Sequence, residues 1–185
     1  MITMKQYKTP LRYPGGKSRA CKKMDPFFPD LRDYDAYYEP FLGGGSVALH
    51  ITKKYPKLKI IVNDLYEPLY NFWLRLQVDG DYVHSQLQQL KSRYPDRGSA
   101  KGLFLDAKEK LYDLDVSDKD RAVCFYIINK CSFSGLTESS SFSAQASDAN
   151  FSMRGIDKLP VYSKLIKDWY ITNVDYHHLL GDKEK

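Results

Sequence analysis

Three consecutive glycines, Gly43 to Gly45, lie between an acidic residue and an apolar segment. Gly43, Gly45 and Ala48 fit the pattern G-x-G-x-x-G/A, and Asp64 follows about 20 residues later, as that pattern requires. Glycines let the backbone turn sharply and approach a ligand, and a carboxylate at this spacing accepts hydrogen bonds from ribose hydroxyls. The residues therefore predict a cradle for an adenosine-bearing cofactor, with a tight structural turn as the alternative.

The residues before the glycines narrow the choice of cofactor. Sites for NAD and for S-adenosylmethionine share the same glycine pattern, but Glu39 and Pro40 stand directly before the loop. A carboxylate there would repel a pyrophosphate, whereas it would attract the sulfonium or amino group of S-adenosylmethionine. The proline fixes the entry into the loop. We therefore expect S-adenosylmethionine.

The surrounding segments must position these residues. Asp35–Phe41 is predicted to be a buried strand that ends at Glu39, Ser46–Tyr55 a helix, and Leu58–Leu65 a second strand with a polar end. Strand, glycine turn, helix and strand in this order predict a βαβ unit with parallel strands. A short helix is expected after Lys17.

The rest of the chain is expected to be mainly helical before it returns to a strand. Apolar residues at helical spacing predict helices from Pro68 to about Phe133, and the serine-rich segment Ser134–Met153 predicts a loop or hairpin. Lys164–Lys167 closes a short helix, and Trp169–Leu180 contains a strand that ends at 173–175. The expected domains are 1–67 and 161–185 of an α/β cofactor domain, with a helical insertion at 68–160.

Composition restricts the class of protein. The chain has 185 residues, 43% of them hydrophobic, and no stretch approaches the roughly 18 apolar residues of a membrane span. The cysteines show no CxxC spacing, and the histidines form no metal-ligand set, so we expect a cytoplasmic protein without metal. The net charge is +5, and residues 1–23 contain basic but no acidic residues. Such a local positive field suits nucleic acid, although a solvated terminal arm is the alternative.

Four segments then resemble one family in both order and spacing. They are RYPGGKS (12–18), EPFLGGGSV (39–47), IVNDLYEPLYNFW (61–73) and YITNVDYHHLL (170–180). Together they resemble the Dam-type, or D12, class of adenine-N6 DNA methyltransferases. The resemblance implies an incomplete Rossmann-like methyltransferase sheet with an inserted helical DNA-recognition subdomain, the cofactor S-adenosylmethionine, and double-stranded DNA as partner.

The resemblance also implies roles for individual residues. Those expected around the cofactor are Tyr13, Gly15, Gly16, Lys17, Glu39, Phe41, Gly43, Gly45, Ser46, Asp64, Asp175 and Tyr176. Among them Asp64 would bind the ribose, and Asp175 and Tyr176 would border the adenine. Those expected at DNA are Lys17, Asn129, Lys130, Phe133, Ser134, Leu136 and Glu138. Ser134 and Glu138 replace the usual Asn and Arg, so recognition of GATC is not implied.

One element of the family pattern is missing. The D/N-P-P-Y/F segment, which holds the target adenine, does not occur in the 185 residues. Asp25 in DPFF is a poor substitute, because it lacks the second proline and precedes the first strand. We expect no catalysis by this chain alone. It could be a truncated methylase, half of an enzyme whose sheet a second polypeptide completes, or a non-catalytic DNA- or protein-binding module.

Overall fold

The computed structural model describes residues 8–135 and 140–181, and its centre is a three-stranded parallel sheet. The strands are β1 (Ala36–Glu39), β2 (Lys59–Asn63) and β3 (Tyr170–Thr172), in the order β1-β2-β3. Tyr38 pairs with Ile61, which pairs with Tyr170. Because all three strands run in the same direction, their carboxyl ends meet at one edge of the sheet.

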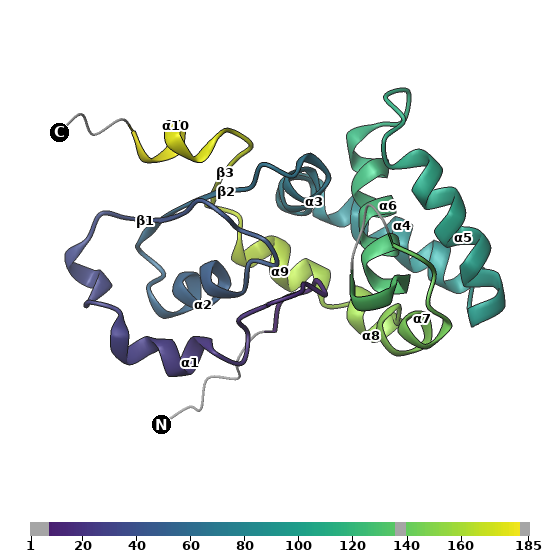
Figure 1. The fold of residues 1–185 in the computed structure, drawn as a ribbon, viewed down its shortest axis with the longest axis horizontal. Helices are drawn as coiled ribbons and strands as arrows, with labels where there is room; N and C mark the ends of the chain where they lie inside the picture. The colour runs from purple at the N-terminus through teal and green to yellow at the C-terminus, as the bar shows by residue number, and fades with distance from the viewer. Residues whose placement is uncertain (1–7, 136–139, 182–185) are drawn as a thin grey trace.

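Short helices cover the sheet and confirm the predicted βαβ unit. The helix α2 (Ser46–Lys54) connects β1 to β2, and its residues Val47, Leu49 and Ile51 are buried. Figure 1 shows α2 and α9 (Leu159–Leu165) on one side of the sheet and α10 (Tyr176–Leu180) on the other. We call the segment before β1, residues 8–35, the N-terminal arm. It forms α1 (Cys21–Met24) and the 3-10 turns η1 (Asp25–Phe27) and η2 (Leu31–Asp33), which confirms a short helix after Lys17.

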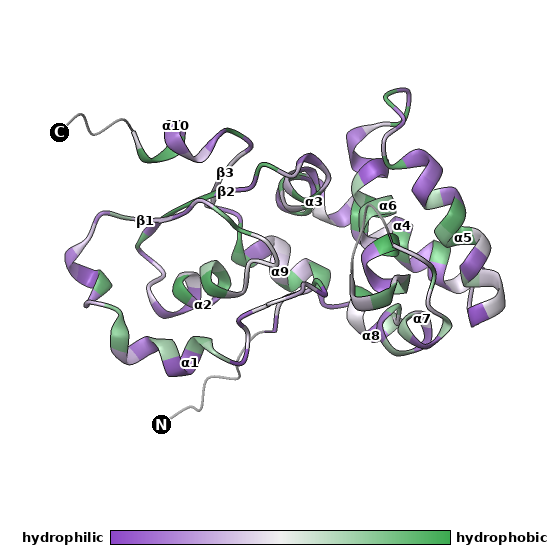
Figure 2. Cartoon of the chain, viewed as in Figure 1, coloured by the Kyte–Doolittle hydropathy of each residue, from purple (hydrophilic) through white to green (hydrophobic). Residues whose placement is uncertain are grey.

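The predicted helices between the strands gather beside the sheet (Figure 1). They are α3 (Glu67–Val78), α4 (Gly80–Arg93), α5 (Arg97–Lys110), α6 (Asp118–Cys131), α7 (Ala144–Asn150) and α8 (Met153–Ile156). The centre is α6, in which every residue from Ala122 to Cys131 is buried. A helix that is buried on all sides must be surrounded by others, and Figure 2 shows the apolar faces of the neighbouring helices turned toward it. We call α3 to α8 the helical part.

Aromatic residues join the helical part to the sheet. Phe72 and Trp73 of α3 are fully buried, and Phe72 stacks on Tyr126 of α6 with ring centroids 6.0 Å apart. The ring centroid of Trp73 lies 5.8 Å from that of Trp169, the residue before β3. Both regions therefore share one apolar core, and the domain boundaries at 67/68 and 160/161 remain predictions.

Two predicted elements differ from the structure. Residues Ser134–Met153 are not only a loop or hairpin, because α7 forms within them: the Ser143 hydroxyl accepts from Ala146 N, and Ala146 and Ser147 are buried. The last strand ends at Thr172 rather than at Asp175. The strand does not continue because the Asn63 side chain donates to Val174 O and accepts from Val174 N, and α10 begins soon afterwards. With these corrections, the fold is compatible with an incomplete methyltransferase α/β sheet.

Candidate functional site

The connection between β1 and α2 is a left-handed glycine turn. Gly43 and Gly45 have φ of +50° and +66°, values that residues with a side chain rarely adopt. A Cβ atom at Gly43 would lie 2.8 Å from Tyr13 Cε1, and one at Gly45 would lie 2.7 Å from Trp73 Cζ2. Both conformation and space therefore require glycine at these two positions.

Side chains from the next two elements hold this turn. The Asp64 carboxylate follows β2 and accepts from Gly43 N at 2.8 Å and from Tyr66 N at 3.1 Å. Trp73 of α3 donates its indole N–H to Gly43 O at 3.1 Å. Asp64 thus braces the loop, and its oxygens keep lone pairs that a ribose hydroxyl could use. Trp73 was not among the predicted site residues, although it closes a segment that carries the family resemblance.

The N-terminal arm lies against the glycine turn and encloses a small cavity. Ser18 Oγ and Ser46 Oγ are 2.9 Å apart, and the Cys21 thiol donates to Lys17 O at 3.2 Å. The cavity has a volume of about 170 Å³. Its lining includes Tyr13, Gly15, Gly16, Lys17, Glu39, Phe41, Gly43, Gly45 and Ser46. The structure thus brings together the two glycine motifs, which lie in separate parts of the sequence.

Glu39 gives this cavity its electrostatic character. It stands at the end of β1, accepts from the Tyr37 hydroxyl at 3.2 Å, and burial raises its pKa to about 7. Lys17 opposes this shift of the Glu39 pKa, and Asp64 adds to it. A carboxylate destabilised by burial gains from a positively charged ligand. The residues present therefore fit S-adenosylmethionine, whose sulfonium and amino groups are cationic, better than a pyrophosphate.

The remaining predicted cofactor residues lie beside this cavity rather than in its lining. The ring of Tyr176 is 5.5 Å from that of Phe41, so α10 borders the loop after β1. Asp175 caps α10, because its carboxylate accepts from His177 N at 2.9 Å. The buried Asn63 donates to Pro40 O at 3.2 Å and to Val174 O at 2.9 Å, which joins the ends of β1 and β3. The sequence analysis assigned no role to Asn63.

Two residues expected at DNA are buried in this structure. Asn129 is 1% exposed, and its carboxamide accepts from Arg12 N and donates to Arg12 O and Gly135 O, at 2.9, 2.7 and 3.1 Å. Lys130 is 9% exposed beneath Arg12 and over the Tyr126 ring, and burial lowers its pKa to about 8. Asn129 therefore connects the N-terminal arm to the loop after α6 instead of presenting a surface contact.

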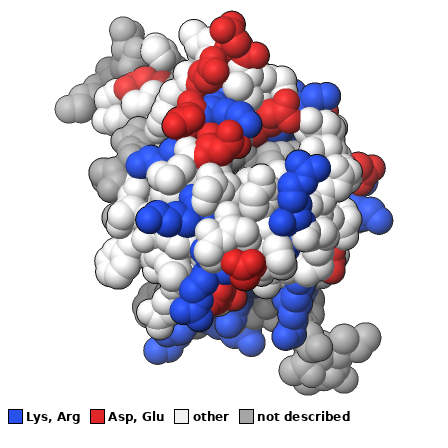
Figure 3. All heavy atoms as spheres, turned by 90° about the vertical axis from the view of Figure 1, so that its right-hand side faces the viewer, with Lys and Arg blue, Asp and Glu red and all other residues white. Residues whose placement is uncertain are grey.

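The other expected DNA residues lie at the surface or outside the described residues. Phe133 is 67% exposed and Ser134 is exposed, whereas Leu136 and Glu138 lie outside the described residues. Arg12 was not among the residues predicted to contact DNA. Its guanidinium donates to Ser132 O at 2.6 Å, next to Phe133. Figure 3 shows the face at the right of Figure 1, with acidic side chains gathered at its top and basic ones more often in its lower part.

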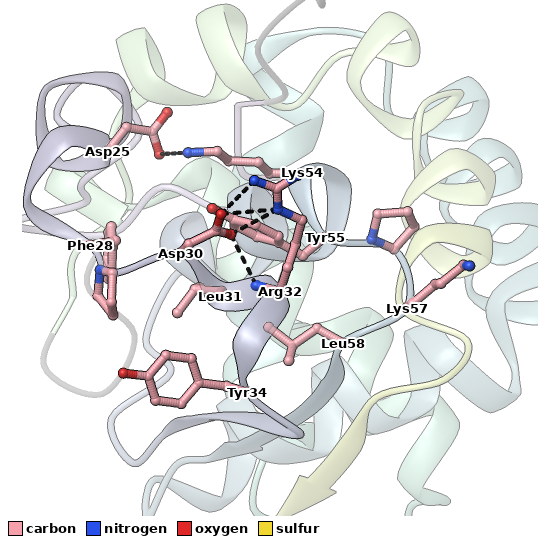
Figure 4. Close-up of a pocket in the computed structure, with 12 residues that line it drawn as sticks. Asp25, Phe28, Asp30, Leu31, Arg32, Tyr34, Lys54, Tyr55, Lys57 and Leu58 are labelled. Carbon is pink, nitrogen blue, oxygen red and sulfur yellow. Dashed lines mark hydrogen bonds and ion pairs between the residues drawn. The ribbon is translucent and has the colours of Figure 1, made fainter.

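A larger cavity, of about 780 Å³, lies at the end of the sheet opposite to the glycine turn (Figure 4). It is bordered by the segment before β1 and by the end of α2, and Asp25 is part of its lining. The Asp25 carboxylate is 2.7 Å from His50 Nε2 and 3.1 Å from Lys54 Nζ. Asp25 is thus engaged far along the sheet from the glycine turn, which gives no support to a role for DPFF in holding a target base.

Residues 8–135 and 140–181 contain no group of three or more histidine, cysteine, aspartate or glutamate side chains arranged to hold a metal ion. None of the helices in these ranges combines the length and the apolar character needed to cross a bilayer.

Comparison with known proteins decides the family. A sequence model of the D12 class N6 adenine-specific DNA methyltransferases matches residues 13–185. The chain belongs to this family. The type II methyltransferase M.MjaIII of Methanocaldococcus jannaschii is 26% identical over 134 residues, which cover 68% of this chain. They cover 46% of that relative, so the chain spans about half the length of the curated protein it matches. The predicted resemblance to the D12 class is therefore confirmed.

Proposed function

We propose that this D12-class chain binds S-adenosylmethionine and double-stranded DNA as part of an adenine-N6 DNA methyltransferase of the cytoplasm. The observation that carries the proposal is the cavity in which the motifs Pro14–Lys17 and Gly43–Ser46 meet around the half-buried Glu39. Ordered glycines give the backbone close access to the ligand, and the carboxylate supplies the charge that a sulfonium requires.

The residues divide the work of holding the cofactor. Glu39 would face its cationic groups, Asp64 its ribose, and Phe41 with Tyr176 its adenine ring. Tyr13 and Lys17, on the N-terminal arm, would cover the methionine end. S-adenosylmethionine, when bound, supplies the methyl group. The arm and the glycine turn would orient this group and exclude water from it.

The DNA side of the proposal rests on the helical part. Phe133 and Ser134 would contact DNA, while Asn129 and Lys130 would support them from below, because both are buried. The basic residues of the N-terminal arm would attract the phosphate backbone. Residues 1–185 contain no D/N-P-P-Y/F sequence. We therefore propose that this polypeptide alone transfers no methyl group and that a further segment or a second polypeptide must hold the adenine.

Two measurements on the purified 185-residue chain test this proposal. Calorimetric titration with S-adenosylmethionine should show saturable binding, and a filter assay with labelled methyl donor should show no incorporation into DNA. A folded protein that binds no cofactor at millimolar concentration would point instead to a non-catalytic DNA- or protein-binding module. Incorporation of label would contradict the requirement for a further segment.

A further inference from the structure

A third cavity, of about 250 Å³, lies where the N-terminal arm meets α7. Its lining is Arg12, Phe133, Ser134, Ser143, Gln145, Ala146, Ala149 and Asn150. None of these lining residues is acidic, and five of them carry side-chain groups that form hydrogen bonds. The cavity thus mixes polar and apolar groups and carries the positive charge of Arg12.

Backbone hydrogen bonds hold residues 133 and 143, which lie on one wall of this cavity. Phe133 N donates to Ser141 O at 3.2 Å and Ser143 N donates to Cys131 O at 2.8 Å, which closes a short hairpin stem. The Asn129 carboxamide fixes the same loop to the backbone of the N-terminal arm. Within it, Ser134 has φ of +55°, the one positive value among non-glycine residues in the part of the chain described. A conformation of this kind persists where the surroundings impose it. Phe133 and Ser134 are both exposed at this cavity.

The helix α7 forms the opposite wall. Its inner residues Ala146 and Ser147 are buried, and the Ser147 hydroxyl lies 3.7 Å from Cys131 Sγ of α6. Gln145 and Ala149 are one helical turn apart and exposed. Because Ala149 is small, it leaves space beside the carboxamide of Gln145. The helix α7 thus carries an amide group that lines this cavity next to the exposed ring of Phe133.

The chemistry of the lining matches a base edge better than a phosphate. A phosphate site gathers several cations, whereas Arg12 is the one cation of this lining and already donates to Ser132 O. A glutamine carboxamide donates and accepts side by side, which matches N6 and N7 of adenine in the major groove. Building on the proposed DNA binding, we infer that Gln145 determines specificity by reading an adenine of the recognition sequence, with Phe133 contacting the same or the adjacent base.

Selection from a pool of randomised DNA duplexes tests this inference. The wild-type chain should enrich a sequence motif that contains an adenine. Gln145→Ala should lose the preference at that one position, keep the rest of the motif, and bind the selected duplex roughly 10- to 100-fold more weakly. The salt dependence of binding should not change, because no phosphate contact is removed. Gln89→Ala, at an exposed glutamine of α4, is the matched control and should select the wild-type motif.

Three outcomes would overturn the inference. They are an unchanged motif for Gln145→Ala, a uniform loss of affinity for all duplexes, and a wild-type chain that enriches no sequence. Cofactor titration of the same samples separates this failure from that of the proposed function. If the wild-type chain binds S-adenosylmethionine but selects no sequence, the role of Gln145 falls while the cofactor site stands. If the wild-type chain selects a motif but does not bind S-adenosylmethionine, the proposed cofactor site falls while the role of Gln145 stands.

Discussion

At the scale of single residues, Glu39 carries the most specific information about the ligand. It is a half-buried carboxylate at the end of a parallel strand, where ligands of such sheets bind. The Tyr37 hydroxyl donates one hydrogen bond to it, and burial raises its pKa to about 7. A cationic ligand beside Glu39 would therefore favour the ionised form of its carboxyl group.

This property predicts a pH dependence of cofactor affinity. Because the pKa of Glu39 is raised to about 7, the group is mostly protonated at pH 6 and ionises as the pH rises. A ligand that needs the ionised form should bind roughly eightfold more tightly at pH 7.5 than at pH 6. Calorimetric titrations with S-adenosylmethionine across this range measure the effect. Glu39→Gln should bind more weakly and show no such dependence, and an equal slope in both proteins would remove Glu39 from the site.

Asp64 supports a second prediction at this scale. Asp64→Ala removes the acceptor of the Gly43 and Tyr66 backbone N–H groups as well as the proposed ribose acceptor. Charged hydrogen bonds contribute about 1.5–3 kcal/mol each, so cofactor affinity should fall by roughly tenfold or more. Titration with S-adenosylmethionine measures the loss. Asp96→Ala, which removes another carboxylate that accepts backbone bonds at a helix start, should leave the affinity unchanged.

At the scale of elements, the helices and strands that depend on residues close in sequence could be predicted. Those that depend on contacts between residues far apart in sequence could not. The strand–glycine–helix–strand unit was predictable, because β-branched runs, glycines and helical spacing all lie within about 30 residues. The helix α7 was not, because a serine-rich segment becomes helical only when Ala146 and Ser147 pack on α6. The early end of β3 depends on Asn63, which is far away in sequence.

The same distinction applies to the candidate site. Glycine and acidic motifs named most of the residues that line the cavity, because those residues recur at fixed spacing in the family. The burial of Asn129 could not be predicted, since its partners Arg12 and Gly135 are brought to it by the tertiary fold. Neither could the role of Trp73, whose indole meets Gly43 from another helix.

The glycine turn gives a prediction about element packing. Gly45→Ala forces a side chain into a left-handed conformation and against Trp73, which should lower the free energy of unfolding by about 2 kcal/mol or more. Gly102→Ala, in the exposed face of α5 with no atom near its added Cβ, should raise it by about 0.5–1 kcal/mol. Thermal unfolding measures both. Equal stability of the two variants would show that the turn is not constrained as described.

At the scale of the whole molecule, two adjacent residues join the proposed cofactor site to the proposed DNA surface. Arg12 is bound by Asn129 of α6 through both of its backbone groups, and Tyr13 packs against Gly43 and Gly44. The N-terminal arm thus crosses from the hairpin after α6 to the cradle. Whatever positions Arg12 also positions Tyr13, so the two proposed sites share a mechanical connection.

This connection predicts that Asn129→Ala affects both sites at once. Loss of the buried carboxamide leaves the Arg12 and Gly135 backbone groups without this partner, at a cost of about 1–3 kcal/mol, or a few degrees in melting temperature. The affinities for S-adenosylmethionine and for DNA, measured at a temperature where the variant is folded, should both fall. Asn71→Ala removes a similarly buried amide that binds Asp118 O within the helical part. It should cost comparable stability while leaving both affinities intact, because it does not touch the arm. If Asn129→Ala lowered stability alone, the arm would not couple the cofactor cradle to the DNA-facing loop.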